Sequence, residues 1–424
     1  MHDIRSEIKE AFARRIDAAP MSPDLAVRVA EHVSRRPQEK QLRFATAVAV
    51  LLATGTVGTL LYLLTASHRQ PQPAATPPPV VTTSPTPSET PAPTPSATAT
   101  ATPPPGPRIT TLRLQDSTNP AGLVWGPDGA LWLAMQNGFA QAGGIERLNA
   151  GGTETRYALP AGVTGANGIT LGPDGALWIA ASGAGGQGQQ GVILRLTTRG
   201  SFTTYALTST RSDAYRITAG PDGALWFTEE YGNRIGRITT SGLVTEYALP
   251  TVPTGAQCGQ RCPLGITAGP DGALWFTESQ FSAGGGNKIG RITVQGAITE
   301  YPLPTRDALP GDIVQGPDGN LWFTEERGAH VGRITPGGQI TEFPLPGAAA
   351  GATTAFVTAG LDGAVWFTGT PARADVGTID RLYRVTTDGT FSELRLPGNA
   401  GSVAAGGGAL WVAGQGQIWR VELQ

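Results

Sequence analysis

Acidic side chains recur at one position of a repeated phrase, and their type suits metal chemistry. The phrase "LWFTE" occurs three times and ends in Glu229, Glu278 and Glu325. A fourth carboxylate, Asp312, stands shortly before the third copy. Carboxylate oxygens are the ligands that Mg²⁺ and Ca²⁺ prefer. The pattern predicts a site for one of these cations at the three glutamates, provided that the fold brings them together.

A structural interpretation of the same glutamates competes with the metal site. Each "LWFTE" is followed by "IGRI" or "VGRI", so the glutamate of one copy would form an ion pair with an arginine of a neighbouring copy. The arginines concerned are Arg237, Arg291 and Arg333. Because glutamate and arginine recur together in all three copies, structural pairing is favoured over metal binding.

Two cysteines and one histidine complete the candidate reactive groups of the long C-terminal part. Cys258 and Cys262 stand close together in "CGQRC", which predicts a local disulfide in an oxidising compartment. As a zinc site the pair would lack two of four ligands. His330, in "RGAHVGRIT", is the only histidine after residue 107 and is expected to be a solvated loop residue.

These groups lie on a repeat that predicts their scaffold. Seven tryptophans occupy one equivalent place, with spacings of 46, 48, 49, 47, 44 and 45 residues. They are Trp132, Trp178, Trp226, Trp275, Trp322, Trp366 and Trp411. This period is typical of four-stranded propeller blades, so residues 108–424 are predicted to form an all-β, seven-bladed β-propeller. The tryptophans are expected to pack between adjacent blades.

Within one copy the strands are bounded by turn signals. "YRITAG" and "ALWFTE" flank a "PDG" hairpin turn, and "RIGRIT" and "LVTEYAL" follow as strands three and four. The last copy has only three strands, whereas "RITTLRL" at residues 108–114 matches a fourth strand without a blade. We therefore expect residues 108–114 to close the ring on the C-terminal strands.

The first 107 residues differ in composition from the repeat. Residues 44–66 form an uncharged apolar run long enough for one transmembrane helix, and residues 1–43 contain nine Lys or Arg. Only Arg69 is basic in the 41 residues that follow the run, so the N-terminus is predicted to be cytoplasmic and the propeller extracellular. Residues 67–107, rich in Pro, Ser and Thr, are expected to form a disordered, semi-rigid stalk.

Residues 1–43 are expected to form short helices that either rest on the membrane or fold against a partner. Residues 4–18 carry one apolar stripe at helical spacing, and residues 22–35 begin with a cap followed by proline. The layout of short helices, one span and an outer domain is similar to that of membrane-bound anti-sigma factors. This similarity implies a cytoplasmic protein partner for residues 1–43.

Charge argues against one class of partner. Residues 108–424 carry 21 Lys or Arg and 25 Asp or Glu, a net charge of −4. A nucleic-acid-binding domain needs a basic surface that neutralises phosphates. We therefore expect no nucleic-acid partner.

The phrases "GPDGALWFTE", "NKIGRIT" and "ITEYPLP" resemble the streptogramin B lyases, a family of virginiamycin B lyase-like propellers, over all seven repeats. The resemblance implies an enzyme that opens cyclic depsipeptide antibiotics by elimination. It also implies Mg²⁺ held by acidic residues, and a histidine base directly before the "GI" of strand one. The equivalent residues here include no histidine; they are Ala121, Asn167, Tyr215, Leu264, Gly311, Ala355 and Gly401.

Two functions follow from these observations. The favoured one is a membrane-anchored, non-catalytic sensor that binds a small molecule or peptide on its axial face through Asn167, Tyr215 and Asp312. The alternative is a lyase in which Tyr215, Asp312 or a glutamate replaces the histidine as the base. General base catalysis contributes ~10²–10⁴-fold to a rate, and tyrosine with a pKa of about 10 is a poor substitute.

Overall fold

The computed structural model describes residues 107–115, 120–136, 143–184, 190–209, 212–250, 263–279, 287–347, 352–370 and 379–423. The chain divides into two units, Met1–Thr98 and Ala99–Gln424, and every described residue belongs to the second. The predicted cytoplasmic segment, transmembrane helix and stalk lie outside the described residues, as do Cys258 and Cys262. Within the described ranges, no helix has the length and apolar character needed to cross a membrane.

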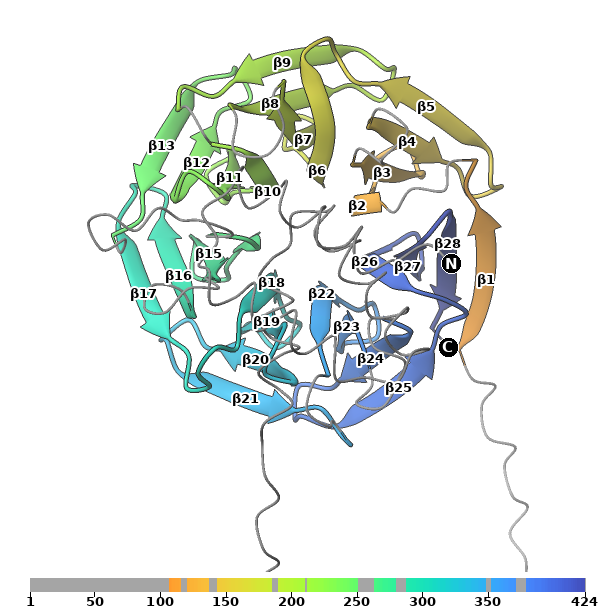
Figure 1. Ribbon diagram of the computed structural model, residues 1–424, viewed down its shortest axis with the longest axis vertical. Coiled ribbons are helices and arrows are strands. Elements are labelled where there is room, and N and C mark those ends of the chain that lie inside the picture. The colour runs from red at the N-terminus through yellow and green to blue at the C-terminus, as the bar shows by residue number, and fades with distance from the viewer. Residues whose placement is uncertain are drawn as a thin grey trace, which may run out of the picture. The chain divides into compact units, whose positions relative to one another are not determined.

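The predicted seven-bladed propeller is confirmed, with seven four-stranded antiparallel sheets arranged in a ring (Figure 1). Blade 1 comprises β2 (Pro120–Trp125), β3 (Leu131–Met135), β4 (Gly144–Leu148) and β5 (Glu154–Ala158). Blade 2 comprises β6 (Val163–Leu171), β7 (Leu177–Gly183), β8 (Gly191–Leu196) and β9 (Phe202–Ala206). Blade 3 comprises β10 (Ala214–Ala219), β11 (Leu225–Glu229), β12 (Arg234–Ile238) and β13 (Val244–Ala248).

The remaining blades follow in chain order, and the last takes its outer strand from the start of the domain. Blade 4 comprises β14 (Ile266–Ala268), β15 (Ala273–Glu278), β16 (Lys288–Thr293) and β17 (Ile298–Pro302). Blade 5 comprises β18 (Pro310–Gln315), β19 (Leu321–Glu325), β20 (His330–Ile334) and β21 (Ile340–Pro344). Blade 6 comprises β22 (Thr354–Ala359), β23 (Val365–Gly369), β24 (Arg381–Val385) and β25 (Phe391–Arg395). Blade 7 comprises β26 (Ala400–Gly406), β27 (Ala409–Gly414), β28 (Gln417–Glu422) and β1 (Arg108–Arg113).

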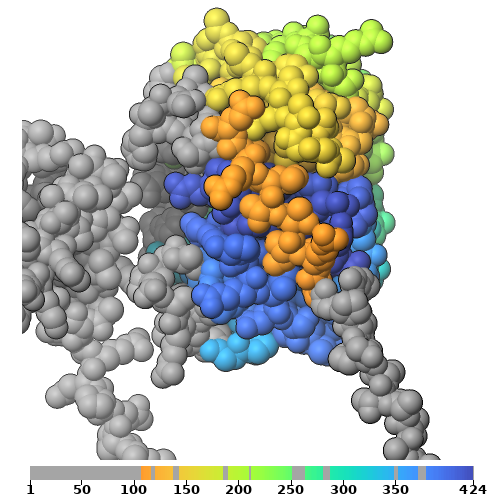
Figure 2. Space-filling view, turned by 90° about the vertical axis from the view of Figure 1, so that its right-hand side faces the viewer, coloured from red at the N-terminus to blue at the C-terminus, as the bar shows by residue number. Residues whose placement is uncertain are grey.

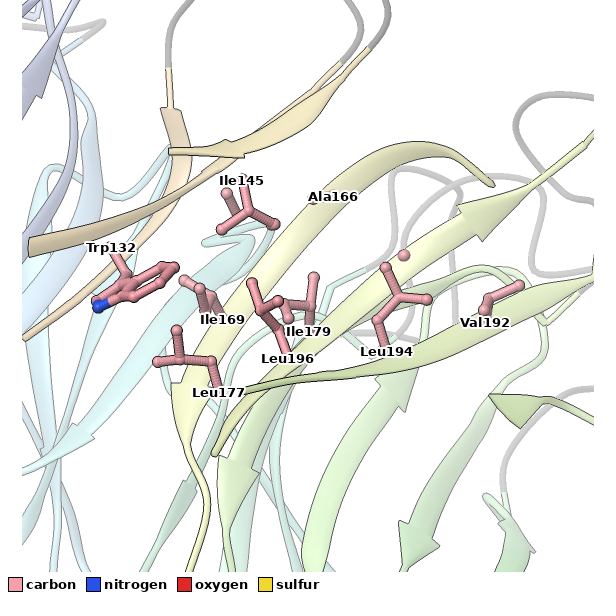
Figure 3. Packing of buried hydrophobic residues seen from close by; sticks show 11 residues of the cluster. Trp132, Ile145, Ala166, Ile169, Leu177, Ile179, Val192, Leu194 and Leu196 are labelled. Carbon is pink, nitrogen blue, oxygen red and sulfur yellow. The ribbon is translucent and has the colours of Figure 1, made fainter. Parts of the chain in front are cut away.

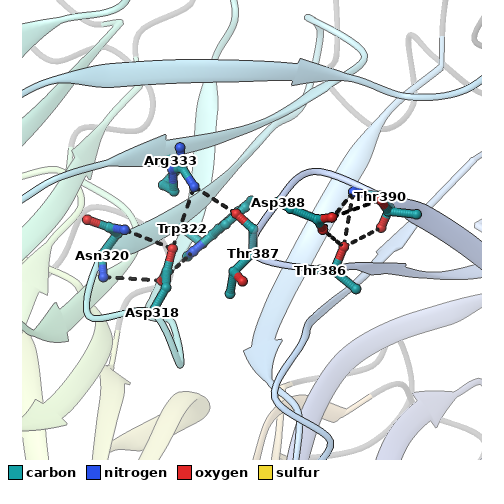
Figure 4. A network of polar contacts seen from close by, with 8 residues as sticks. All are labelled: Asp318, Asn320, Trp322, Arg333, Thr386, Thr387, Asp388 and Thr390. Atoms are coloured by element: carbon teal, nitrogen blue, oxygen red, sulfur yellow. Dashed lines mark hydrogen bonds and ion pairs between the residues drawn. The ribbon is translucent and has the colours of Figure 1, made fainter.

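The "PDG" aspartate fixes each of the first six blades internally. In blade 5, Asp318 Oδ1 accepts a hydrogen bond of 3.0 Å from the indole N–H of Trp322, while Arg333 Nη1 lies 3.7 Å from Asp318 Oδ2 (Figure 4). In the other five the arginine Nε donates to the aspartate over 2.6 or 2.7 Å. The glycine before each proline or leucine is required because an added Cβ would lie within 2.5 Å of the indole ring.

The tryptophans pack between blades, as predicted. Trp132 of blade 1 belongs to the buried cluster formed by Leu177, Ile179 and Leu194 of blade 2 (Figure 3). Its ring also stacks on Tyr157 of its own outer strand, with ring centroids 5.4 Å apart. Full burial of one large apolar side chain stabilises a fold by ~1.5–3 kcal/mol, and this contact is repeated around the ring.

Ring closure also follows the prediction. β1 pairs with β28 over six residues, from Arg108 opposite Glu422 to Arg113 opposite Gln417. In Figure 2 the orange surface of the first described residues lies against the blue surface of the last ones. Ile109 and Leu112 of β1 pack against the two clusters on either side of blade 7.

Candidate functional site at the propeller axis

Two consecutive residues in or just before each first strand occupy equivalent places in the inner ring of the propeller. Each of the seven first strands contacts the first strands of both adjacent blades, so together they form the inner ring (Figure 1). We call the earlier residue the first axial position; it is Ala121, Asn167, Tyr215, Leu264, Gly311, Ala355 or Gly401. The next residue is the second axial position; it is Gly122, Gly168, Arg216, Gly265, Asp312, Phe356 or Ser402. None of the fourteen is histidine.

Threonine side chains fix the axial backbone in blades 3 to 6. In blade 4, Thr277 Oγ1 accepts a hydrogen bond from Gly265 N (2.9 Å) and donates one to Gly311 O of blade 5 (2.7 Å). Thr228, Thr324 and Thr368 likewise each donate a hydrogen bond to the carbonyl at the first axial position of the next blade. Because buried carbonyls need a donor, this threonine connects each blade to its neighbour.

Blades 1, 2 and 7 carry alanine at the threonine position, as Ala134, Ala180 and Ala413. By the pattern of the other blades, a threonine in place of Ala413 would donate to Ala121 O, and one in place of Ala134 would donate to Asn167 O. Arg216 supplies both: its Nη1 donates 2.9 Å hydrogen bonds to each. One arginine from blade 3 thus spans the axis and replaces two threonines.

The Arg216 guanidinium is held between aromatic rings. Its central carbon lies 4.8 Å from the Tyr215 ring centroid and 5.2 Å from that of Phe356, which comes from blade 6. Cation–π contacts at these distances stabilise by ~0.5–2 kcal/mol. Arg216 therefore has a defined position at the axis although its side chain is only partly buried.

Asn167 occupies a first axial position and is fixed by a polar network. Its Nδ2 donates to Ser182 Oγ (3.0 Å) and to Ala214 O (2.8 Å), and its Oδ1 accepts from Gln136 Nε2 (3.1 Å). Ser182 Oγ donates to Asp213 Oδ1 over 2.7 Å. A buried amide with these partners holds three blades in register, and it has no basic lone pair that could take a proton.

Asp312 faces the same axis from blade 5. Its Oδ1 accepts from Ile313 N (3.1 Å) and its Oδ2 from Val357 N of blade 6 (3.3 Å). Burial raises the pKa of the Asp312 carboxyl, although the positive charge of Arg216 and the two backbone N–H groups act in the opposite direction. The structure therefore brings Asn167, Tyr215 and Asp312 to one ring around Arg216.

The predicted pairing of the "LWFTE" glutamates with the "GRI" arginines is wrong. Arg237 binds Asp222 of the turn in its own blade, and Arg291 and Arg333 behave in the same way. Glu229 is fully buried and accepts a 3.3 Å hydrogen bond from Ser209 Oγ, which also bonds Glu246 of the outer strand β13. Burial and the charge of Glu246 raise the pKa of Glu229 to about 8, although Arg234 and Ser209 act in the opposite direction.

In blades 4 and 5 the residues opposite the second-strand glutamate, equivalent to Arg234 of blade 3, are Lys288 and His330. Lys288 Nζ lies 2.6 Å from Glu300 Oε2 in blade 4. In blade 5, burial and Glu342 raise the pKa of Glu325 to about 8. His330 was expected to be a solvated loop residue, but it is the first residue of β20. Its Nδ1 lies 3.6 Å from Glu325 Oε2.

The glutamates do not form a common cation site. Glu229 and Glu325 each interact with an outer-strand glutamate of their own blade, Glu246 and Glu342, and Glu278 lies opposite Lys288 in the strand register. Within the described ranges, no group of three His, Cys, Asp or Glu side chains has the geometry to hold a metal ion. The residues described here therefore do not fit the Mg²⁺ that the family resemblance implied.

Arg216 and the threonine bridges are the axial features that the repeat did not predict. A signal for both is present in the sequence: "YRIT" places arginine where "NGIT" and "LGIT" have glycine, and "LWLA", "LWIA" and "LWVA" replace "LWFT". Each is a departure from the repeat. Only the structure shows that the arginine compensates for two of the three alanines, Ala134 and Ala413.

The fold and this axial ring define a seven-bladed propeller with a polar centre, and comparison identifies its family. Residues 107–280 and 256–424 match the virginiamycin B lyase family, so the chain belongs to that family. Virginiamycin B lyase from Staphylococcus aureus is 33% identical and has a TM-score of 0.62, with 75% of this chain and 100% of the lyase covered.

Two further structures are informative. A catalytically inactive histidine-to-alanine variant of the S. aureus lyase, solved with quinupristin, is 33% identical, with a TM-score of 0.63 and coverage of 75% of this chain and 100% of that one. The extracellular domain of BT4673 from B. thetaiotaomicron is 16% identical, with a TM-score of 0.55 and coverage of 73% and 42%. The second likeness shows the fold alone. A search of curated proteins gave no match.

Proposed function

We propose that this protein is a sensor or binding module whose propeller takes a small molecule or peptide at its axial face without catalysing elimination. The observation that carries the proposal is the absence of histidine from all seven first axial positions, every one of which the structure describes. In the S. aureus lyase, exchange of one histidine for alanine abolishes catalysis. A shared fold does not supply the missing base.

The residues at these positions support binding rather than proton transfer. Asn167 has its amide held by three hydrogen bonds and is not a base at any working pH. Arg216 and Phe356 occupy second axial positions with charge and aromatic surface, which are common features of ligand sites. The ring is therefore equipped to recognise a ligand with a polar group.

The sequence of the first 107 residues supplies the rest of the proposal. One apolar segment, with basic residues before it and a proline-rich segment after it, would place the propeller outside the cell on a stalk. Residues 1–43 would then transmit occupancy to a cytoplasmic protein partner.

A lyase with a substituted base is the second candidate, and Asp312 is the residue that favours it. A carboxyl whose pKa is raised by burial approaches the range in which a general base works best. The 33% identity to virginiamycin B lyase over the whole of that enzyme also favours this candidate.

Incubation with a streptogramin B antibiotic separates the two functions. The purified chain would be mixed with virginiamycin S and Mg²⁺, and the ring-opened product followed by mass spectrometry, with the S. aureus lyase as positive control. We expect no turnover above background. Turnover near ~1 per second would contradict the sensor proposal. In that case, its loss in Asp312→Asn or in Tyr215→Phe would identify the base.

A further inference from the structure

Arg216 has more hydrogen-bonding capacity than the fold uses. Its Nη1 carries both structural hydrogen bonds, to Ala121 O and Asn167 O. Among the residues that the structure describes, neither Nε nor Nη2 has a hydrogen-bond partner, and neither is a fully enclosed atom. A guanidinium has five N–H donors in a planar fork, so one edge remains open at the axis.

The charge of this guanidinium is not neutralised by contact. The charge of Arg216 opposes the rise of the Asp312 pKa, yet no ion pair joins the two side chains in the described part of the chain. The Asp312 oxygens instead accept hydrogen bonds from Ile313 N and Val357 N.

The surroundings also orient an incoming group. The rings of Tyr215 and Phe356 lie near the guanidinium carbon at 4.8 and 5.2 Å, so they restrict where a ligand can approach. A planar acceptor with two oxygens matches the open edge through two parallel hydrogen bonds. An apolar group attached to that acceptor would contact Phe356.

We propose that the ligand of the axial site carries a carboxylate, which binds the Nε and Nη2 edge of Arg216. This inference rests on the proposed binding function and names the chemical class of its ligand. Arg216 then has two separable tasks. Nη1 replaces the threonine donors that blades 1 and 7 lack, and the opposite edge binds the ligand.

A matched pair of probes tests the carboxylate. The full-length chain would be titrated into 4-fluorophenylacetate and, separately, into the neutral 4-fluorophenylacetamide, with binding followed by ¹⁹F NMR line broadening. We expect the carboxylate to bind at least ~10-fold more tightly than the amide, because only the carboxylate forms two charge-assisted hydrogen bonds in which both partners are ionised. Equal affinities, or binding of neither probe, would overturn the inference.

A rescued variant separates the two tasks of Arg216. Arg216→Met removes the guanidinium, and Ala134→Thr with Ala413→Thr restores hydroxyl donors to Asn167 O and Ala121 O. We expect this triple variant to keep the thermal midpoint of the native protein within a few degrees and to lose the preference for the carboxylate probe. A folded triple variant that retains the preference would overturn the inference.

A second variant keeps the inference testable if the triple variant does not fold. Asp312→Asn removes the carboxylate that influences Arg216 and leaves the Nη1 hydrogen bonds intact. It should bind 4-fluorophenylacetate at least as tightly as the native protein does and leave the affinity for the amide unchanged, because no repelling carboxylate can then stand near the guanidinium. A weaker affinity for 4-fluorophenylacetate would show that Asp312 rather than Arg216 holds the carboxylate and would contradict the proposal. These outcomes are independent of streptogramin turnover, so failure of the carboxylate proposal is distinguishable from failure of the sensor proposal.

Discussion

At the scale of single residues, the axis shows how a repeat compensates for its own substitutions. The Thr277 hydroxyl accepts a hydrogen bond from the buried Gly265 N–H and donates one to the buried Gly311 carbonyl. Alanine at the same position leaves a carbonyl without a donor, which costs ~1–3 kcal/mol for each buried group. Arg216 removes that cost at two carbonyls, because its side chain is long enough to reach blades 1 and 2 from blade 3.

Glu229 predicts a measurable pH dependence of stability. The pKa of Glu229 is raised to about 8 in the folded protein, from an ordinary value of 4.5. The unfolded chain releases this proton above pH 4.5 while the folded chain keeps it. The stabilising contribution is therefore complete below pH 4.5 and is lost as the pH rises to about 8. Glu229→Gln should consequently be more stable than the native protein at pH 8, by about 4 kcal/mol, and similar to it at pH 4.5.

Urea unfolding of both proteins at the two pH values checks this expectation. The native protein at pH 4.5 is the internal control, because both of its states are then close to the same protonation. A difference in unfolding free energy of equal size at both pH values would show that Glu229 is ionised in the folded protein.

At the scale of strands and turns, sequence reasoning succeeded wherever the partners lie in the same short phrase. Alternating apolar residues, the Asp-Gly pair and the tryptophan spacing determined the strands, the blade number and the position of Trp226. Sequence reasoning did not predict the partners of the charged residues in the same phrase. Arg237 of β12 pairs with Asp222 in the turn between β10 and β11, whereas Glu229 interacts with Glu246 on the outermost strand. These choices depend on strand register and on which sheet face each side chain occupies, and neither is visible in one repeat.

The closing strand β1 gives a prediction at the same scale. A chain that begins at residue 107 retains all six pairs with β28, whereas one that begins at residue 114 exposes the edge of β28. The shorter chain should lose at least ~3 kcal/mol of unfolding free energy, since the packing of Ile109 and Leu112 is lost, and it should associate through the open edge. Denaturant unfolding and light scattering measure both effects. Equal midpoints and two monomeric chains would show that β1 does not contribute to closure.

At the scale of the whole molecule, the charge asymmetry of the first 107 residues predicts the topology. If basic residues 1–43 are retained inside, protease added to intact cells should cut within residues 67–107 and release a fragment that contains the propeller. Immunoblotting of the supernatant detects this fragment. A cytoplasmic marker protein, cleaved only after lysis, is the control. Full protection of the propeller in intact cells would contradict the predicted orientation.

The pairing of β1 with β28 has a mechanical consequence. Any pulling force applied to the chain before residue 108 enters the domain at Arg108, where the pairing begins opposite Glu422. A pull along the strand direction loads the hydrogen bonds of all six pairs at once, whereas a sideways pull loads them one after another. The pairing of β1 with β28 would thus be the first part of blade 7 to bear the load, and the direction of the load would set the force required to separate the two strands.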